Sequence, residues 1–385
     1  MKMGIEGLKG NNSLIKKFPN CLIKIKCSEL RNKRIAVDVM WMARACRSTA
    51  NNEVLAETDL RTDKISELKI TKLWLRRFAE FITDMYSHEI LPVFVFDGKP
   101  PIEKTETLKK RREDEKSKRE KIFECEEKLF GYWNATSVLE IAPNNIIEEY
   151  TKLLKNNSNI PRGDFDILKQ VFKYFGCPYI QAPSEAEKLC SSMVIDGLVT
   201  AIYTTDTDVL AHGAPLMFNN YNRYEKTFEG IRVDVIREEC ELHHDEFIEF
   251  CILSGCDYND GVKGIGPVSA LKLIKKYKCI ELIKDSKITD LSLIKAELCR
   301  SLFKYEPAKD MCNFDFDKLT IDMSFLNEGI DFLQHYELDK YLEMLTKNSS
   351  NLSFKNEDPQ NRTLGIKKVI KYVPIRIEDG IVYVN

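Results

Sequence analysis

The sequence lacks any apolar run long enough to cross a membrane. A membrane-spanning helix needs roughly 18 consecutive apolar residues, and no stretch of the 385 residues approaches that length. Residues 1–5 also lack the apolar core that a signal peptide requires. With 43% hydrophobic and 31% charged residues, the composition excludes both a membrane protein and a disordered chain. We therefore expect a soluble, globular, intracellular protein.

Zinc-type cysteine spacing is absent as well. The 12 cysteines are scattered at irregular intervals, with no Cys-x-x-Cys pair and no histidine at zinc-ligand distance. This pattern favours reduced thiols packed in the interior over disulfides or a zinc site. No internal repeat of 20 to 50 residues is present either, which argues against a repeat architecture.

The chain also carries almost no net charge, −2 at pH 7, so total charge neither indicates nor excludes nucleic acid as a partner. The distribution of charge is more informative. Residues 104–121 contain nine Lys or Arg. The stretch 105–128 has almost no apolar face, which predicts a helix that lies outside the core.

Short apolar runs alternate with helical patterns along the chain. Three of these runs predict strands that end beside acidic residues, namely 35–37, 91–96 and 199–204. Helical patterns are predicted at about 65–88, 163–176 and 184–195, with a short strand at 178–180. This alternation predicts an α/β fold with a central, mostly parallel sheet flanked by helices. Functional groups in such folds gather at the carboxyl ends of the strands.

Seven acidic residues are the strongest candidates for a functional site. They are Asp38, Asp97, Glu185, Glu187, Asp206, Asp208 and Asp257. Carboxylates are the hard oxygen ligands that Mg²⁺ and Mn²⁺ require, and two such ions about 4 Å apart stabilise the entering and leaving oxygens of a phosphodiester. Each acid taken alone is as well explained as a helix cap or turn residue. Gathered in one place, the acids would repel one another without cations.

A glycine-rich turn follows the last of these acids. Residues 261–267 place closely spaced glycines ahead of a helical pattern at 268–277, so backbone N–H groups and a helix N-terminus are available to phosphate. This is typical of a helix–hairpin–helix grip on duplex DNA, although a plain helix connection would look similar. The candidate DNA-binding residues are Lys263, Gly264, Gly266, Lys272, Lys275 and Lys276 of this element, together with Arg44. Such binding would be salt-dependent and would not depend on base sequence.

Two cations of the basic stretch are candidates for catalysis. Lys104 and Arg111 lie seven residues apart, which is two turns along one face of a helix. We interpret them as the side chains that contact the scissile phosphate and stabilise the charge of the transition state. The alternative is a helix face that is merely solvated.

Four motifs in order resemble those of flap endonucleases. They are 97–101 (Asp-Gly-Lys-Pro-Pro), 183–187 (Pro-Ser-Glu-Ala-Glu), 205–208 (Thr-Asp-Thr-Asp) and 254–258 (Ser-Gly-Cys-Asp-Tyr). The resemblance covers roughly residues 3–280. It implies a nuclease domain with a helical arch and a helix–two-turn–helix element, two bound Mg²⁺ that Mn²⁺ can replace, and room for K⁺ at that element.

The resemblance also implies a reaction and a role for each acid. By motif position, Asp38, Asp97, Glu185 and Glu187 belong to the first metal, and Asp206, Asp208 and Asp257 to the second. The implied substrate is branched or nicked duplex DNA with a 5′ single-stranded flap. Hydrolysis of one phosphodiester would leave a 3′-hydroxyl and a 5′-phosphate, in DNA replication, repair or recombination.

We expect a single nuclease domain over residues 3–330. It would contain an N-terminal nuclease region at about 3–130, an internal region at about 163–280 and the DNA-binding element at about 255–278. The arch and an insertion would occupy 104–162, with 144–162 a variable excursion. Residues 331–385 form an extension without a predicted structure, in which 348–362 reads as a linker.

Several features depart from the family pattern. Two residues precede Met3, so the true first residue is Met1 or Met3, and Arg44 stands where flap endonucleases carry an aromatic residue. Residues 250–258 are also similar to the related 5′→3′ exonucleases. Gln360 is not followed by the aromatic residues of a sliding-clamp motif. A sliding clamp is therefore a possible partner for which the sequence has no clear binding motif.

Three alternatives to a flap endonuclease therefore stay open. One is a 5′→3′ double-stranded DNA exonuclease of the same family, and another is an RNA-directed nuclease. The third is a catalytically inactive DNA-binding or scaffold protein. We expect a monomer without membrane partners, located in the nucleus in a eukaryote or at a cytoplasmic replication site for a virus.

Overall fold

The computed structural model describes residues 4–8, 13–134, 142–155, 157–259, 261–285, 291–292, 294–349, 375–378 and 381–384. The two possible start residues and the predicted linker core at 350–362 lie outside this part of the chain. Residues group into two compact units. The first unit comprises Met1–Glu29, Cys190–Asp310 and Lys355–Asn385, and the second comprises Leu30–Leu189 and Met311–Phe354. The expectation of one nuclease domain stays a prediction.

The second unit is built on three parallel strands in the order β2-β3-β4. Their bounds are β2 Arg34–Asp38, β3 Leu91–Phe96 and β4 Tyr179–Gln181. Every residue of β2 and β3 is buried, as expected for parallel strands covered on both faces. The predicted strands at 35–37, 91–96 and 178–180 are therefore confirmed.

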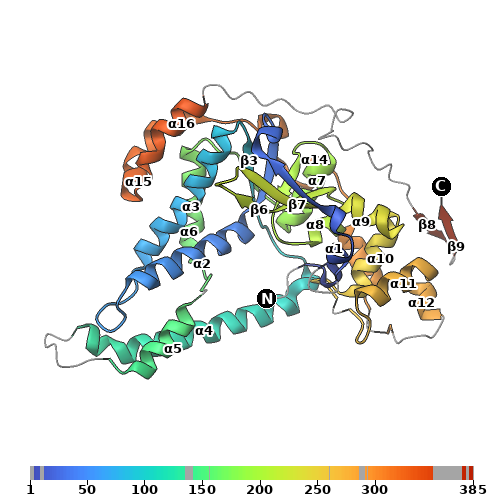
Figure 1. Ribbon diagram of the computed structural model, residues 1–385, viewed down its shortest axis with the longest axis horizontal. Helices are drawn as coiled ribbons and strands as arrows, with labels where there is room; N and C mark the ends of the chain where they lie inside the picture. Colours follow the sequence, from blue (N-terminus) through green and yellow to red (C-terminus); the bar gives the residue numbers. More distant parts are fainter. Residues whose placement is uncertain are drawn as a thin grey trace. The chain divides into compact units, whose positions relative to one another are not determined.

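The helices of this unit are labelled in Figure 1. They are α2 Val39–Glu57, α3 Glu67–Ser87, α4 Thr105–Trp133, α5 Asn144–Leu154, α6 Arg162–Tyr174, α15 Ile330–His335 and α16 Leu342–Ser349, with α7 Ala186–Ile195 running across the boundary between the units. The short 3-10 helices are η4 Ile102–Lys104, η5 Phe316–Lys318, η6 Met323–Phe325, η7 Asn327–Gly329 and η8 Asp339–Tyr341. An aromatic core joins sheet to helices, since the rings of Phe94 and Phe172 stack at 4.0 Å and Phe78 packs against both.

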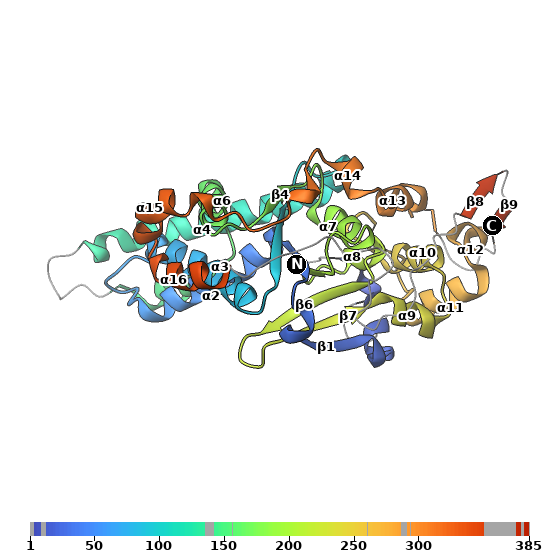
Figure 2. The same cartoon turned by 90° about the horizontal axis from the view of Figure 1, so that it is seen from above.

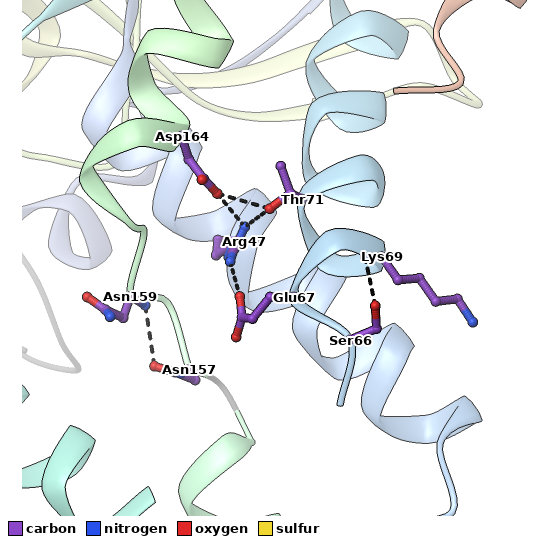
Figure 3. Close-up of polar contacts among 8 residues, drawn as sticks. All are labelled: Arg47, Ser66, Glu67, Lys69, Thr71, Asn157, Asn159 and Asp164. Carbon is purple, nitrogen blue, oxygen red and sulfur yellow. Dashed lines mark hydrogen bonds and ion pairs between the residues drawn. The ribbon is translucent and has the colours of Figure 1, made fainter. Parts of the chain in front are cut away.

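A buried arginine ties three helices of this unit together (Figure 3). Arg47 of α2 donates hydrogen bonds to Thr71 of α3 at 3.0 Å and to Asp164 of α6 at 2.9 Å. It also pairs with Glu67 at 2.6 Å, and only 3% of its side chain is exposed. Buried charges are tolerated when they are paired in this way, so the cluster fixes how α2, α3 and α6 pack.

The charged stretch forms the long helix α4, which is polar on most of its surface, as predicted. Its C-terminal part is anchored, since Cys125 and Leu129 are buried and Glu126 accepts a hydrogen bond from the Tyr150 hydroxyl of α5 at 2.9 Å. The indole N–H of Trp133 donates to the Leu60 carbonyl at 3.0 Å. Residues 144–154, predicted as a variable excursion, are therefore a helix that packs against α4.

The first unit contributes four strands in the order β1-β7-β6-β5, of which β1, β6 and β7 are labelled in Figure 2. They are β1 Leu22–Lys26, β5 Ala201–Tyr203, β6 Leu216–Asn222 and β7 Thr227–Arg232. Strand β5 runs parallel to β6, whereas β6 and β1 are antiparallel to β7. The predicted α/β class is confirmed. The pairs β2–β3, β3–β4 and β5–β6 are parallel, and the pairs β1–β7 and β6–β7 are antiparallel.

The remaining elements of the first unit are mainly helical. They are η1 Glu6–Leu8, α1 Leu14–Lys17, η2 Pro19–Cys21, η3 Cys27–Leu30 at the boundary, α8 Asp208–Ala211, α9 Val233–Cys240, α10 His244–Ser254, α11 Pro267–Tyr277, α12 Ile280–Asp285, α13 Ala296–Phe303 and α14 Ala308–Met311. Strands β8 Ile375–Glu378 and β9 Ile381–Val384 form an antiparallel hairpin. In the described residues no helix is long and apolar enough to cross a membrane.

Candidate metal centre

Two of the predicted acids stand at the carboxyl ends of neighbouring parallel strands in the second unit. Asp38 ends β2 and is in register with Val95 of β3, and Asp97 follows the last residue of β3. The backbone N–H of Trp41 donates to Asp38 Oδ1 at 3.2 Å, so this carboxylate caps α2. Asp38 is therefore a helix cap, which was one of the two roles expected for an acid here. The hydrogen bond from Trp41 orients its carboxylate at the edge of the sheet.

Asp97 is tied to the segment that carries Glu185 and Glu187. Its Oδ1 accepts a hydrogen bond from the Ala186 backbone N–H at 2.7 Å. The adjacent Gly98 donates its N–H to the Ser184 carbonyl at 2.6 Å. A Cβ atom on Gly98 would lie 2.0 Å from the Ala182 carbonyl oxygen, so only glycine permits this approach.

Lys104 lies between the two glutamates. Its ammonium group pairs with Glu185, and lies 3.7 Å from a carboxylate oxygen of Glu187. All three residues are buried, with exposures of 6%, 8% and 7%. Two buried carboxylates would repel without a cation, and the ammonium supplies positive charge here. The carboxylate oxygens of Glu185 and Glu187 are ligands of the kind that a hard divalent ion takes.

The surroundings of Asp97 change the pKa of its carboxyl group. Removal from bulk water raises the pKa of Asp97, the N–H of Ala186 lowers it, and the charge of Glu185 raises it again. The positive charges of Lys104 and Arg44 oppose the increase. The net direction of the Asp97 pKa is upward, mainly because the carboxyl group is removed from water.

The first unit holds a second acidic pair. Asp206 follows β5 and Asp208 begins α8, with exposures of 7% and 0%. Asp206 Oδ1 accepts the Asp208 backbone N–H at 3.1 Å, and the two residues offer carboxylate oxygens within 4.8 Å of each other. Asp257 lies in a turn after α10 in the same unit and is 8% exposed.

The predicted DNA-binding residues of the glycine-rich element are exposed in the turn before α11 and along α11. Gly264 has φ +87 and Gly266 precedes Pro267 at the first position of α11. Lys263, Lys272, Lys275 and Lys276 are all exposed. Lys275 pairs with Glu241 at 2.7 Å. The left-handed conformation at Gly264 explains why the turn needs glycine there.

The two candidate catalytic cations lie on consecutive helical segments. Lys104 ends η4 and is the N-cap of α4, with αR backbone angles, and Arg111 lies within α4. Their joint action on a phosphate stays a prediction. Arg44 lies on α2, with Glu115 of α4 3.8 Å away. Sequence reasoning missed the pairing of Lys104 with the glutamates, since no local signal links residues 81 positions apart.

A separate cavity of about 310 Å³ lies in the second unit beside the Arg47 cluster. It contains none of the predicted site residues. Its lining is formed by Glu67, Leu68, Thr71, Asn157, Asn159, Pro161, Asp164, Ile167 and Tyr336.

Comparison with known proteins agrees with this arrangement. The family model described as the XPG N-terminal domain matches residues 3–118, and the XPG I-region model matches residues 176–257. A probable RAD2-like endonuclease 369L of Invertebrate iridescent virus 6 is 30% identical over 316 residues, which are 71% of this chain and 72% of the relative. The chain belongs to the XPG family of structure-specific nucleases.

Members of this nuclease family share both sequence and fold with the chain. Flap endonuclease 1 of Methanococcus aeolicus is 32% identical over 283 residues, covering 72% of this chain and 77% of the relative. The catalytic core of Rad2 in complex with DNA substrate superposes with a TM-score of 0.59 at 20% identity, over 87% of this chain and all of that one. The XPG family consists of metal-dependent, hydrolytic nucleases, so the chain is an enzyme of this class.

Proposed function

We propose that this XPG-family nuclease cuts branched DNA at 5′ flaps and at junctions of single- and double-stranded DNA. The observation that carries the proposal is that two acidic pairs, Glu185 with Glu187 and Asp206 with Asp208, are buried at the ends of strands or at helix starts. Burying several carboxylates is costly unless cations compensate them. Relatives named flap endonuclease support this choice of substrate.

The residues proposed to hold two Mg²⁺ are the seven acids predicted from the sequence. Bound Mg²⁺ would supply an activated water at neutral pH and would neutralise charge on the phosphate. Lys104 and Arg111 would act on the scissile phosphate, with Lys104 moving away from Glu185 as DNA enters. Lys263, Lys272, Lys275 and Lys276, with the N–H groups near Gly264 and Gly266, would hold duplex DNA through its phosphates. K⁺ is proposed at the same turn.

The main alternative is a 5′→3′ exonuclease, favoured by the likeness of residues 250–258 to that branch. Arg44 stands where flap endonucleases carry an aromatic ring, so it is the first residue to test when the two activities are compared. A monomer acting in the nucleus of a eukaryote, or at a viral replication site, fits either activity. Recruitment by a sliding clamp would need a motif other than Gln360.

Cleavage of matched, end-labelled substrates tests the proposal. We would compare 5′-flap, nicked, gapped, blunt duplex and RNA flap substrates with Mg²⁺ and with EDTA. A 5′-flap preference with one main product supports the flap endonuclease, whereas stepwise mononucleotide release from duplex ends supports the exonuclease. Cleavage of the RNA flap alone would redirect the proposal to RNA.

An Asp208→Asn variant tests the metal assignment. It should lose at least about 100-fold in cleavage rate, since even neighbours of metal ligands cost 10–100-fold. DNA binding, measured in EDTA, should be retained. Asp331→Asn, at an exposed acid of α15, is the matched control and should cut normally. If Asp208→Asn kept normal Mg²⁺-dependent cleavage with unchanged DNA binding, the assignment would be wrong.

A further inference from the structure

The turn that carries Asp206 and Asp208 is bonded to the N-terminal segment, residues 4–8. The backbone N–H of Ile5 donates to Thr207 Oγ1 at 2.8 Å, and the Thr207 hydroxyl lies 3.5 Å from the Ile5 carbonyl oxygen, to which it donates. Ile5 is fully buried and Thr207 is 3% exposed. Water therefore has little access to replace these bonds if the hydroxyl is lost.

The Thr207 side chain bonds Ile5 and does not cap its own helix. It stands at the N-cap of α8, where a threonine side chain normally accepts a hydrogen bond from the first turn of its own helix. Its side chain makes no such bond. The hydroxyl is directed instead to a residue 202 positions away in the sequence.

Gly4 brings the same segment against the Asp206 carboxylate. Its φ is +71, and a Cβ atom there would lie 2.3 Å from Asp206 Oδ1 and 2.5 Å from Thr207 Oγ1. Any side chain would displace the carboxylate or the hydroxyl. The packing and the backbone conformation both require glycine at this position.

The segment also contacts the chain just before Asp257. The Glu6 backbone N–H donates to the Gly255 carbonyl at 3.1 Å. A Cβ atom on Gly7 would lie 2.6 Å from Ser254 Oγ. Residues 4–8 are therefore packed against two acid-bearing segments of the first unit at once.

We propose that Thr207 is a positioning residue that orients Asp206 and Asp208 for a divalent cation by bonding the backbone of Ile5. Mg²⁺ requires near-ideal octahedral geometry at about 2.1 Å from each oxygen, so a small rotation of either carboxylate weakens binding. The inference rests on the proposed function, because it assumes that these acids hold metal.

Mn²⁺ binding by the full chain, measured by calorimetry without DNA, tests the inference. Thr207→Val keeps the shape of the side chain and removes the hydroxyl, and it should weaken Mn²⁺ binding by about 10-fold, as for other groups that orient metal ligands. Thr207→Ser restores the hydroxyl and should bind within about twofold of the unmodified chain, since the net worth of the hydrogen bond is retained. Cleavage by Thr207→Val should recover at high Mg²⁺ concentration, because the ligands themselves remain.

The outcomes separate positioning from a purely structural role. Unchanged Mn²⁺ affinity in Thr207→Val, even with a lower melting temperature, overturns the inference, as does a Thr207→Ser variant as weak as Thr207→Val. If Thr207→Val does not fold, Gly4→Ala takes its place with the same expected loss. If the unmodified chain binds no Mn²⁺ and cuts no DNA, the proposed function fails and this inference fails with it. If the unmodified chain and Thr207→Val bind Mn²⁺ equally well, this inference is overturned and the proposed function is not.

Discussion

Replacing Arg47 by methionine should destabilise the second unit strongly. The guanidinium is 3% exposed and donates to Asp164 and Thr71, so the replacement leaves Asp164, whose side chain is only 13% exposed, without its cation. Breaking a buried ion pair by removing one partner costs about 3–5 kcal/mol. The third partner, Glu67, is 66% exposed and contributes little. We therefore expect a loss near the lower end, about 3 kcal/mol.

Urea unfolding followed by tryptophan fluorescence measures this loss. The three tryptophans, Trp41, Trp74 and Trp133, all belong to the second unit, so the signal reports the unit that holds the Arg47 cluster. Arg31→Met is the matched control, because Arg31 also pairs with a glutamate but is 65% exposed. That variant should unfold at the same urea concentration as the unmodified chain.

A double replacement, Arg47→Met with Asp164→Leu, sharpens the prediction. It removes both charges, so the uncompensated carboxylate disappears and apolar side chains occupy the space. The double variant should be more stable than Arg47→Met alone. The reasoning is refuted if Arg47→Met shifts the midpoint no more than the Arg31 control does, or if the double variant is less stable than the single one.

Three further predictions concern other parts of the chain. Gly98→Ala should lower the melting temperature and weaken Mn²⁺ binding, because its Cβ would lie 2.0 Å from the Ala182 carbonyl oxygen. Gly131→Ala, in open space on α4, is the control and should stabilise the chain by about 0.5–1 kcal/mol. The free energy of unfolding should fall as pH drops from about 6.5 towards 4, because burial lowers the pKa of His244 to about 4 and the unfolded chain takes up the proton first. The urea midpoint of His244→Asn should depend less on pH across this range. A midpoint with the same pH dependence as in the unmodified chain would contradict this role of His244. Lys272→Ala should reduce the salt dependence of DNA binding by about one phosphate contact, with a log–log slope change of about 0.9, whereas Lys275→Ala should change it less, since Lys275 pairs with Glu241.

Some strands of the first unit could not be predicted from the sequence. Strand β1 is half-exposed along its length and carries Lys24 and Lys26, and β6 contains three asparagines, so neither resembles a buried strand. Both form because each pairs with β7 in an antiparallel ladder. Strand propensity depends on such neighbours more than on the residues themselves.

The order of the acids at the strand ends was determined by the sequence alone. Short runs of β-branched and aromatic residues that end at turn residues favour strands, so Asp38 and Asp97 follow β2 and β3 as the local pattern predicts. The sequence also determined that 105–128 is a helix outside the core, because its charges leave almost no apolar face.

Only the tertiary structure decided what each acid contacts. Asp97 accepts a hydrogen bond from Ala186, 89 positions away, and Thr207 bonds Ile5 across 202 positions. Lys104, at the junction of η4 and α4, pairs with Glu185, 81 positions away. Such contacts arise when packed elements bring distant segments together, and neither periodicity nor spacing within one segment records them.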